Sequence, residues 1–397
     1  MAEWIECSIG DLCNTISDTY KGDDEHVVLV NTSDVLEGKV LNHEIVVNKN
    51  LKGQFKKTFK KDDILYSEIR PGNKRFAYID FENTSNYIAS TKLMVLRHND
   101  KVLPEYLFAL LKSNYVIDEL QHLAETRSGT FPQITFSSEL APMKVFLPDK
   151  DTQKRIVSIL SSIEQKIDEN TAINNNLLEQ ALAIYKDWFC DYALSDGTLP
   201  ENWKITTIDA ISSLVTRGIA PKYDDSSDQI VLNQKCIRDH TIDISFARRH
   251  LPKKINEKWI SKGDLLINST GTGTLGRVAQ VWFEVNNMTV DSHVTIVRPK
   301  DSILQSYIGF WGLSHESEIE AQHTGSTGQT ELPRDRVKAM ELPLPDEDTL
   351  SKFNELVIPM TSTVISNQEE NARLSQLRDA LLPKLMSGEL DVSGIDL

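Results

Sequence analysis

The sequence has no long apolar stretch, few cysteines and no clustered metal ligands. No apolar run approaches the roughly 18 residues that a membrane-spanning helix needs. The first residues are acidic and lack the basic and apolar regions of a signal peptide. Cys7, Cys13, Cys190 and Cys236 have no C-x-x-C spacing, and the nine histidines do not gather near them. We therefore expect a cytoplasmic protein with neither membrane association, zinc site nor disulfide framework.

Recognisable catalytic motifs are also missing. The sequence contains no P-loop, no nucleophile elbow and no N-P-P-Y methyltransferase motif. Gly271–Gly276 reads G-T-G-T-L-G, but the dinucleotide-binding form of this motif must open a helix. Here a strand-like run, Arg277–Phe283, follows it. We interpret Gly271–Gly276 as a glycine-rich hairpin loop, and we expect no cofactor and no catalytic residues.

Length and composition fit an ordinary globular protein. The chain has 397 residues, of which 40% are hydrophobic and 25% charged. This length predicts two or three domains, each with its own core. The net charge of −15 at pH 7 argues superficially against nucleic-acid binding. However, local fields decide whether a surface attracts phosphate, so the net charge leaves that question open.

The sequence contains an internal repeat, with matching segments about 197 to 201 residues apart. The matched pairs are Trp4 with Trp203, Lys61–Leu65 with Lys262–Leu266, Val95–Arg97 with Ile296–Arg298, and Leu147–Thr152 with Leu344–Thr349. Two periods are too few for a solenoid, which needs three or more to bury its core. The repeat therefore indicates two similar domains, each followed by its own connecting segment.

Each repeat reads as a strand-rich domain followed by a long helix. Apolar-polar alternation predicts strands at Val27–Val30, Ile64–Tyr66, Phe76–Ile79, Leu93–Leu96, Ile230–Leu232, Leu265–Ile267, Val278–Trp282 and Val294–Val297. Helical patterns follow near Tyr106–Leu120 and Leu304–Glu320. We predict an α+β fold with domains at 1–150 and 196–347 and helical segments at 151–195 and 348–397.

Both helical segments carry a heptad seam. Apolar residues recur at a and d spacing over Ile156–Trp188 and, 197 residues later, over Phe353–Leu385. The seams contain asparagines at the same places: Asn170, Asn174, Asn367 and Asn371. We predict an antiparallel two-helix coiled coil that separates the domains, with a layer of paired amides setting its register. Pro359 lies inside the second seam and predicts a kink or a late start of that helix.

Basic residues gather once in each repeat. The clusters are Lys49, Lys52, Lys56, Lys57, Lys60 and Lys61, and Arg248, Arg249, Lys253, Lys254, Lys258 and Lys262. One such cluster alone would more often be a solvated face, but its recurrence in an acidic protein favours contacts to the DNA backbone. Base reading would fall to side chains in nearby loops. The candidates are Arg70, Lys74, Arg75, Arg127, Gln133, Thr272, Thr274, Arg277 and Gln329.

In their order along the chain, several motifs resemble the specificity subunit of type I restriction-modification systems. They are Tyr185–Phe189, Leu199–Trp203, Lys262–Leu266, the stretch from Ser326–Gln329 to Pro343–Pro345, and Leu381–Leu390. The resemblance implies two target-recognition domains that each read half of a split, non-palindromic site in double-stranded DNA. It also implies two docked copies of an adenine methyltransferase (modification) subunit, with restriction subunits in the full complex. The first repeat departs from the pattern at Asp62 and at Thr130–Gln133, where glycine is usual.

Two other classes of function remain open at this point. The chain could be a coiled-coil scaffold whose paired domains bind proteins and have no DNA specificity. It could also be a stand-alone enzyme that uses the Gly271–Gly276 loop for a nucleotide. The pseudo-twofold repeat itself favours DNA recognition over both of them, because two fused domains with unlike loops should read two unlike half-sites at a fixed spacing.

Overall fold

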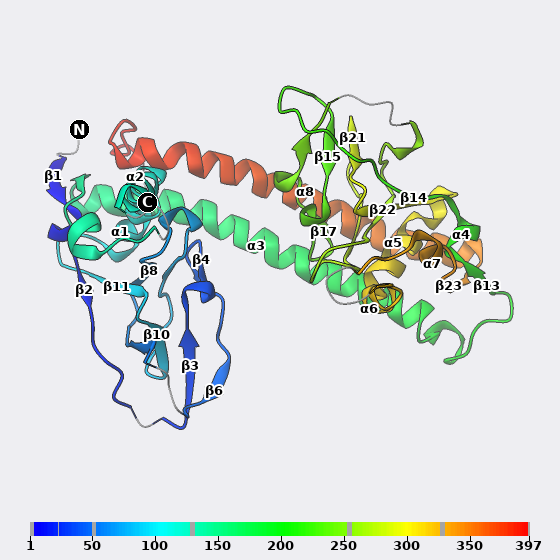
Figure 1. Cartoon of the computed structure of the whole chain (residues 1–397), viewed down its shortest axis with the longest axis horizontal. Helices are drawn as coiled ribbons and strands as arrows, with labels where there is room; N and C mark the ends of the chain where they lie inside the picture. Colours follow the sequence, from blue (N-terminus) through cyan, green and yellow to red (C-terminus); the bar gives the residue numbers. More distant parts are fainter. Residues whose placement is uncertain are drawn as a thin grey trace. The chain divides into compact units, whose positions relative to one another are not determined.

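The computed structural model describes residues 4–22, 24–49, 53–127, 132–251, 256–325 and 330–395 (Figure 1). The chain divides into two compact units. Unit 1 comprises Met1–Ile167 and Ala372–Leu397, and unit 2 comprises Asp168–Asn371. The long helices α3 (Lys150–Phe189) and α8 (Glu347–Met386) contribute a segment to each unit. No helix in the described part of the chain has the length and apolar character to cross a membrane.

Unit 1 contains two four-stranded sheets. The first is antiparallel, in the order β2 (Cys13–Ile16), β11 (Leu93–His98), β8 (Ile64–Ser67) and β9 (Phe76–Tyr78). The second has the order β6 (Ile45–Val47), β3 (His26–Val30), β10 (Tyr87–Ser90) and β7 (Phe55–Lys57). Within it, β3 and β10 run parallel. Smaller pairs are β1 (Ile5–Ser8) with β12 (Lys144–Leu147), and β4 (Val35–Leu36) with β5 (Lys39–Val40).

Unit 2 repeats this topology. Its antiparallel sheet has the order β14 (Ser212–Arg217), β22 (Val294–Pro299), β19 (Leu265–Asn268) and β20 (Val278–Gln280). Its second sheet has the order β18 (Arg248–Arg249), β15 (Ile230–Leu232) and β21 (Met288–Val290), with β15 and β21 parallel. Smaller pairs are β13 (Lys204–Thr207) with β23 (Glu341–Leu344), and β16 (Ile237–Arg238) with β17 (Thr241–Ile242). The repeat seen in the sequence is therefore a repeat of the fold.

The strands expected from alternation are confirmed, whereas each expected helix is divided in two. In unit 1 the helices are α1 (Pro104–Leu111) and α2 (Asn114–Arg127); in unit 2 they are α5 (Gln305–Ser314) and α6 (Glu316–Ala321). Ser113 explains the break in unit 1, because its hydroxyl donates to the carbonyl of Leu110 and accepts the N–H of Val116. Short helices α4 (Ile208–Ile211) and α7 (Arg334–Lys338) complete unit 2.

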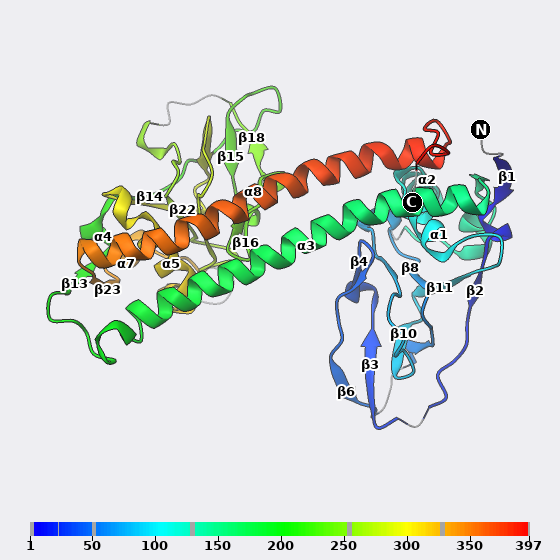
Figure 2. The same cartoon turned by 180° about the vertical axis from the view of Figure 1, so that it is seen from behind.

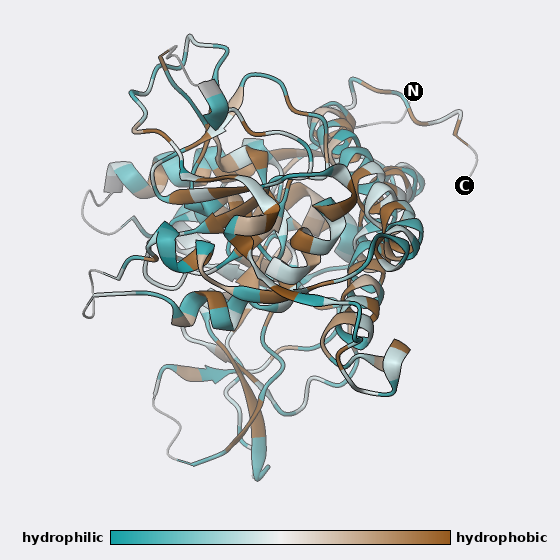
Figure 3. Ribbon diagram, turned by 90° about the vertical axis from the view of Figure 1, so that its right-hand side faces the viewer, coloured by the Kyte–Doolittle hydropathy of each residue, from teal (hydrophilic) through white to brown (hydrophobic). Residues whose placement is uncertain are grey.

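The cores form where the strands and the long helices bury their apolar faces. In unit 1, Ile156 and Leu160 of α3 pack in one cluster with Leu385 of α8 and the first sheet. In unit 2, Tyr185 of α3 and Phe353 of α8 lie in an aromatic cluster, with ring centroids 6.1 Å apart. In Figure 3, hydrophobic (brown) segments are concentrated in the strands and helices, while many of the outer loops are hydrophilic (teal). The predicted seam residues thus anchor each domain to both helices of its unit.

A buried ion pair explains two of the repeated motifs. Arg97 makes two hydrogen bonds of 2.7 Å to the carboxylate of Asp63, and Arg298 binds Asp264 in the same way at 2.8 and 2.7 Å. The two carboxylates are 0% and 1% exposed. Burial raises the pKa of Asp264 even though Arg298 counteracts it. The bond joins the start of β8 or β19 to β11 or β22, so it fixes the central strands of each first sheet.

The residue before each buried aspartate has a left-handed backbone. Asp62 has φ of 68° and Gly263 has φ of 92°. Glycine adopts this region without cost, and aspartate is among the side chains that tolerate it. The departure of Asp62 from the family pattern therefore leaves the local backbone shape unchanged.

The repeated L-P-D-x-D-T motif begins the two long helices. Asp149 accepts the N–H of Thr152 at 2.8 Å, and Asp346 accepts that of Thr349 at 3.0 Å. Each carboxylate also accepts the threonine hydroxyl, and Asp346 accepts the indole N–H of Trp203 at 3.1 Å. The backbone N–H of Thr349 is the main reason that the pKa of Asp346 falls to about 2. The motif is therefore a helix N-cap.

Two further expectations concern glycines and proline. Gly271–Gly276 connects the antiparallel strands β19 and β20, so the predicted hairpin loop is confirmed. Gly271, Gly273 and Gly276 have φ of 103°, 72° and 85°, which explains the residue type. The expected late start of the second helix is wrong, because α8 begins twelve residues before Pro359 and continues past it.

We expect Arg298→Ala to lower the free energy of unfolding by about 3 to 5 kcal/mol, because it leaves the Asp264 charge buried without its partner. Chemical denaturation of the purified chain measures this loss. The control Lys262→Ala removes the exposed ion pair to Glu284, which is 3.0 Å long, and should cost less than about 1 kcal/mol. Equal losses of unfolding free energy for the two variants would contradict the conclusion that the buried pair holds the central strands together.

We expect Asp346→Ala to cost about 0.5 to 2 kcal/mol at neutral pH, because α8 loses its N-cap. The folded-state pKa is depressed from 3.8 to about 2, so this contribution is present above pH about 4 and fades as the pH falls toward 2. Denaturation curves of the variant and the unmodified chain should therefore converge in acid. Asp348→Ala is the matched control, since its carboxylate pairs only with exposed Lys352; a similar pH-dependent loss there would refute the cap.

Candidate nucleic-acid interface

The basic cluster of unit 1 lies on and around the edge strand β7. Lys56 is exposed, whereas Lys57 is half-buried and its ammonium donates to the carbonyl of Leu93 at 2.8 Å. Burial lowers the pKa of Lys57. Lys61 forms an ion pair of 2.7 Å with Glu82 at the surface. Lys56 is thus open to a ligand, as are the exposed Lys49 and Lys60.

In the basic cluster of unit 2, as in unit 1, some cations bind backbone carbonyls and others are exposed. Lys258 donates to the carbonyl of Gly218 at 3.0 Å, and Arg249 donates to a backbone carbonyl at 2.5 Å. The guanidinium of Arg248 lies 3.4 Å from the ring centroid of Tyr223, and both residues are exposed. Since Lys57 and Lys258 both hold backbone carbonyls, their recurrence reflects the fold, and Arg248 presents the accessible charge.

The basic loop after β8 is a tight turn. Arg70 and Lys74 flank it with left-handed φ of 45° and 53°. Arg70 is exposed, while Lys74 lies 3.7 Å from Glu37. Arg75 points inward and donates to the carbonyls of Ser33 and Val35. Of the predicted loop residues, Arg70 is therefore the one that presents an open cation.

The other candidates are spread over the loops of both units. Thr272 is exposed at the hairpin between β19 and β20, Thr274 donates to the carbonyl of Thr270 at 3.3 Å, and Arg277 is half-buried. Arg127 is the last residue of α2. Four candidates lie outside the described residues: Lys52, Lys253, Lys254 and Gln329.

Sequence reasoning missed a polar cluster beside these loops. In unit 1, Glu68 accepts a hydrogen bond of 3.0 Å from the predicted Gln133 and lies 3.7 Å from the ammonium of Lys92. In unit 2, the hydroxyl of Thr270 lies 2.8 Å from Nδ1 of His293. Lys92 and His293 occupy matching positions in the two repeats but differ in residue type, whereas Glu68 aligns with Ser269 and Thr270 aligns with Ile69. A search for repeated residues therefore could not find them.

Helices α3 and α8 run side by side within unit 2 (Figures 1 and 2), and the asparagines of their seams pair there. Asn170 donates to Asn371 at 2.9 Å, and Asn367 donates to Asn174 at 2.8 Å. Asn170 and Asn174 are 1% and 7% exposed. The pairing is crosswise, because residue numbers rise along α3 while they fall along α8. These segments of the two helices are therefore antiparallel.

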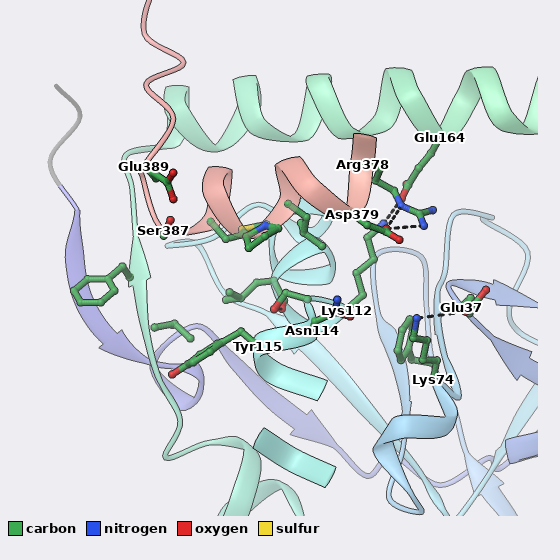
Figure 4. A pocket seen from close by; sticks show the side chains of 18 of the residues that line it. Glu37, Lys74, Lys112, Asn114, Tyr115, Glu164, Arg378, Asp379, Ser387 and Glu389 are labelled. Atoms are coloured by element: carbon green, nitrogen blue, oxygen red, sulfur yellow. Dashed lines mark hydrogen bonds and ion pairs between the residues drawn. The ribbon is translucent and has the colours of Figure 1, made fainter. Parts of the chain in front are cut away.

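A pocket of about 580 Å³ in unit 1 lies between the end of α8 and the domain (Figure 4). Its apolar lining includes Leu382 and Met386, and Lys112 reaches across it to Glu164 on α3. Among the candidate DNA-binding residues, only Lys74 lines it. The pocket can hold an amphipathic group, and it is separate from the lysine-bearing strand.

No group of three or more His, Cys, Asp or Glu side chains suited to a metal ion occurs among the described residues. All four cysteines are free thiols. Burial raises the pKa of Cys13 to about 12 and that of Cys236 to about 11, so neither is poised as a nucleophile.

Comparison with known proteins places the chain in a family. Residues 1–179 match the model of the type I restriction modification DNA specificity domain. The chain is 31% identical to the type I restriction enzyme HindI specificity subunit of Haemophilus influenzae, over 98% of this chain and all of that protein. The chain belongs to the type I specificity-subunit family. It is also 25% identical to the MjaIX specificity subunit of Methanocaldococcus jannaschii, over 74% of this chain and 70% of that one.

The fold agrees with a solved member of this family. The S subunit of a type I restriction-modification system from M. genitalium matches 99% of this chain and 97% of its own, with a TM-score of 0.56 and 14% identity. At that identity the likeness concerns the α+β fold alone.

For this specificity subunit we expect the single change Asn170→Leu to cost about 1 to 3 kcal/mol, because it removes the hydrogen bonds that the buried amide of Asn170 donates to Asn371 and Glu370. The double change Asn170→Leu with Asn371→Leu should recover most of that loss, since both partners become apolar. Thermal and chemical unfolding of the two variants measures the difference.

The control is Asn175→Leu, at an exposed position of the same helix, which should change stability by less than about 0.5 kcal/mol. Additive losses in the double variant would show that the two amides do not act as a pair.

Proposed function

We propose that this chain is the non-catalytic subunit that gives a type I restriction-modification complex its DNA sequence specificity. Each domain reads one half of a bipartite, non-palindromic site in double-stranded DNA. The observation that carries the proposal is 31% identity to a specificity subunit over 98% of the chain, in a molecule built of two units with one topology. Such a subunit would act on DNA in the cytoplasm.

The domains recognise DNA, and the helical segments set their spacing and bind the partner subunits. Residues 1–150 and 196–347 form the two target-recognition domains, and residues 151–195 and 348–397 form the helical spacers. The paired asparagines support a coiled coil whose register fixes the distance between the half-sites. Because the helical segments nearly repeat, they offer two equivalent docking surfaces for two adenine methyltransferase subunits. Restriction subunits join this assembly in the full complex.

The phosphate contacts belong to the accessible cations. Lys56 and Arg70 in unit 1 and Arg248 in unit 2 are exposed. Lys57 and Lys258 act beside them by holding the backbone that presents this surface. Cations of this kind bind the DNA backbone without sequence preference, so they supply affinity and orientation rather than specificity.

The deciding experiment is a genome-wide map of adenine methylation in cells that carry the partner methyltransferase, with and without this chain. We expect a split, non-palindromic motif that appears only with the chain. If the methyltransferase is expressed and soluble but the chain leaves methylation unchanged, a protein-binding scaffold becomes the better interpretation.

We expect Lys56→Ala, in the complex with the methyltransferase, to weaken DNA binding by a similar factor for all sequences. The slope of log K against log salt should fall by about one per lost phosphate contact. Titrations at several salt concentrations measure both effects. Lys204→Ala, an exposed lysine of β13, is the control and should leave the slope unchanged. A loss confined to one target sequence would instead assign Lys56 to base reading.

A further inference from the structure

We propose that base recognition centres on the polar cluster beside the lysine-bearing surface of each unit. Its members are Glu68, Lys92 and Gln133 in unit 1, and Thr270, His293 and Glu331 in unit 2. This inference rests on the proposed DNA recognition and names the side chains that perform it. We refer to the two sets as the reading clusters.

Two backbone hydrogen bonds join the three chain segments that carry the reading cluster of unit 1. The N–H of Glu68, just past the end of β8, donates to the carbonyl of Lys92 at 3.0 Å. The carbonyl of Glu68 accepts the N–H of Ile134 at 2.8 Å. Gln133 thus enters the cluster from a segment far away in the sequence, and the three side chains emerge at one place.

Unit 2 builds the same frame with other residues. The N–H of Ser269 donates to the carbonyl of His293 at 2.8 Å, and its carbonyl accepts the N–H of Leu332 at 2.8 Å. A bridge between Thr270 and Glu331 matches the bridge between Ile69 and Gln133 in unit 1. Lys92 therefore corresponds to His293 and Gln133 to Glu331, while Thr270 lies one residue after Ser269, the counterpart of Glu68.

On this common frame the chemistry differs. Unit 1 presents a carboxylate, an ammonium and an amide, whereas unit 2 presents a hydroxyl, an imidazole and a carboxylate. Glutamate accepts from the amino group of cytosine, glutamine pairs with adenine, and lysine donates to guanine. Threonine and histidine can donate or accept. Equal frames with unequal donors and acceptors are what two unlike half-sites require.

The surroundings of the reading clusters favour DNA rather than a purely structural role. Lys92, His293 and Glu331 are exposed. Glu331 forms a 2.9 Å ion pair with Arg217, but its side chain is 58% exposed, so the pair adds little stability. The buried aspartate–arginine pairs already hold the strands in place, which leaves these side chains available for a ligand.

In each unit, a lysine that holds the backbone of the basic surface also contacts the backbone next to the reading cluster. In unit 1, Lys57 holds the carbonyl of Leu93, the residue after Lys92. In unit 2, Lys258 holds the carbonyl of Gly218, whose N–H donates to Val294, the residue after His293. Lys57 and Lys258 thus lie beside the reading clusters at the same place in each repeat. A base-reading centre beside backbone-binding cations is the usual arrangement of a DNA interface.

The test is a methylation map of cells that express the methyltransferase with the full chain carrying His293→Ala or, separately, Gln133→Ala. We expect each variant to relax or change the motif in one half only, and the two variants to affect opposite halves. Methylation of the original site relative to sites that differ by one base in the affected half should fall roughly tenfold to a hundredfold.

Lys204→Ala serves again as the control and should leave both halves unchanged. An unchanged motif in both variants, with the unmodified chain giving a clear bipartite motif, would overturn the reading clusters but not the proposed function. No motif with the unmodified chain would instead remove the proposed function itself.

Loss of the complex could imitate loss of recognition, so assembly with the methyltransferase is measured in parallel. If His293→Ala prevents assembly, His293→Gln is used, because its amide keeps both a donor and an acceptor. A changed half-motif in an assembled His293→Gln complex supports the proposal. An assembled complex with the original motif, or failure of both variants to assemble, overturns it.

Discussion

The buried carboxylate of each unit needs its guanidinium, and much of the remaining structure depends on that pair. Asp63 with Arg97, and Asp264 with Arg298, join the central strands of the two first sheets. A buried charge without a partner is strongly unfavourable, so neither strand can shift along the other without breaking the pair. The loops that leave these strands therefore start from the same place in both units, whatever residues they carry.

The features that could be predicted from the sequence are those that depend on local periodicity or on repetition. The strand at Ile64–Tyr66 and its counterpart at Leu265–Ile267 are predicted from apolar-polar alternation, and the hairpin at Gly271–Gly276 from its glycines and the strand-like run after them. Repetition located the two helix starts but did not explain them. Only the structure shows Asp149 as an N-cap, because that role depends on which N–H groups its carboxylate reaches.

The features that could not be predicted are those decided by three-dimensional partners. Lys57 looks like a phosphate contact in the sequence, yet its ammonium holds a backbone carbonyl of a strand 36 residues away. The sequence repeat matches Asn170 with Asn367 and Asn174 with Asn371. In the structure, however, Asn170 bonds to Asn371 and Asn367 to Asn174, because α3 and α8 are antiparallel in unit 2. Lys92 and His293 are unlike residues, and only the matching backbone hydrogen bonds that they accept show that they occupy corresponding positions.

The two repeats share the residues that hold their strands in place but differ in the residues of the reading clusters. The residues that recur, such as buried Asp264 and half-buried Arg298, define the geometry of the strands, whereas the residues of the reading clusters diverge and are exposed or half-buried. A change at an accessible side chain alters recognition at little cost in stability, because the buried pair still fixes the strands. Since each half of the chain has its own buried pair, one half can acquire a new target without disturbing the other.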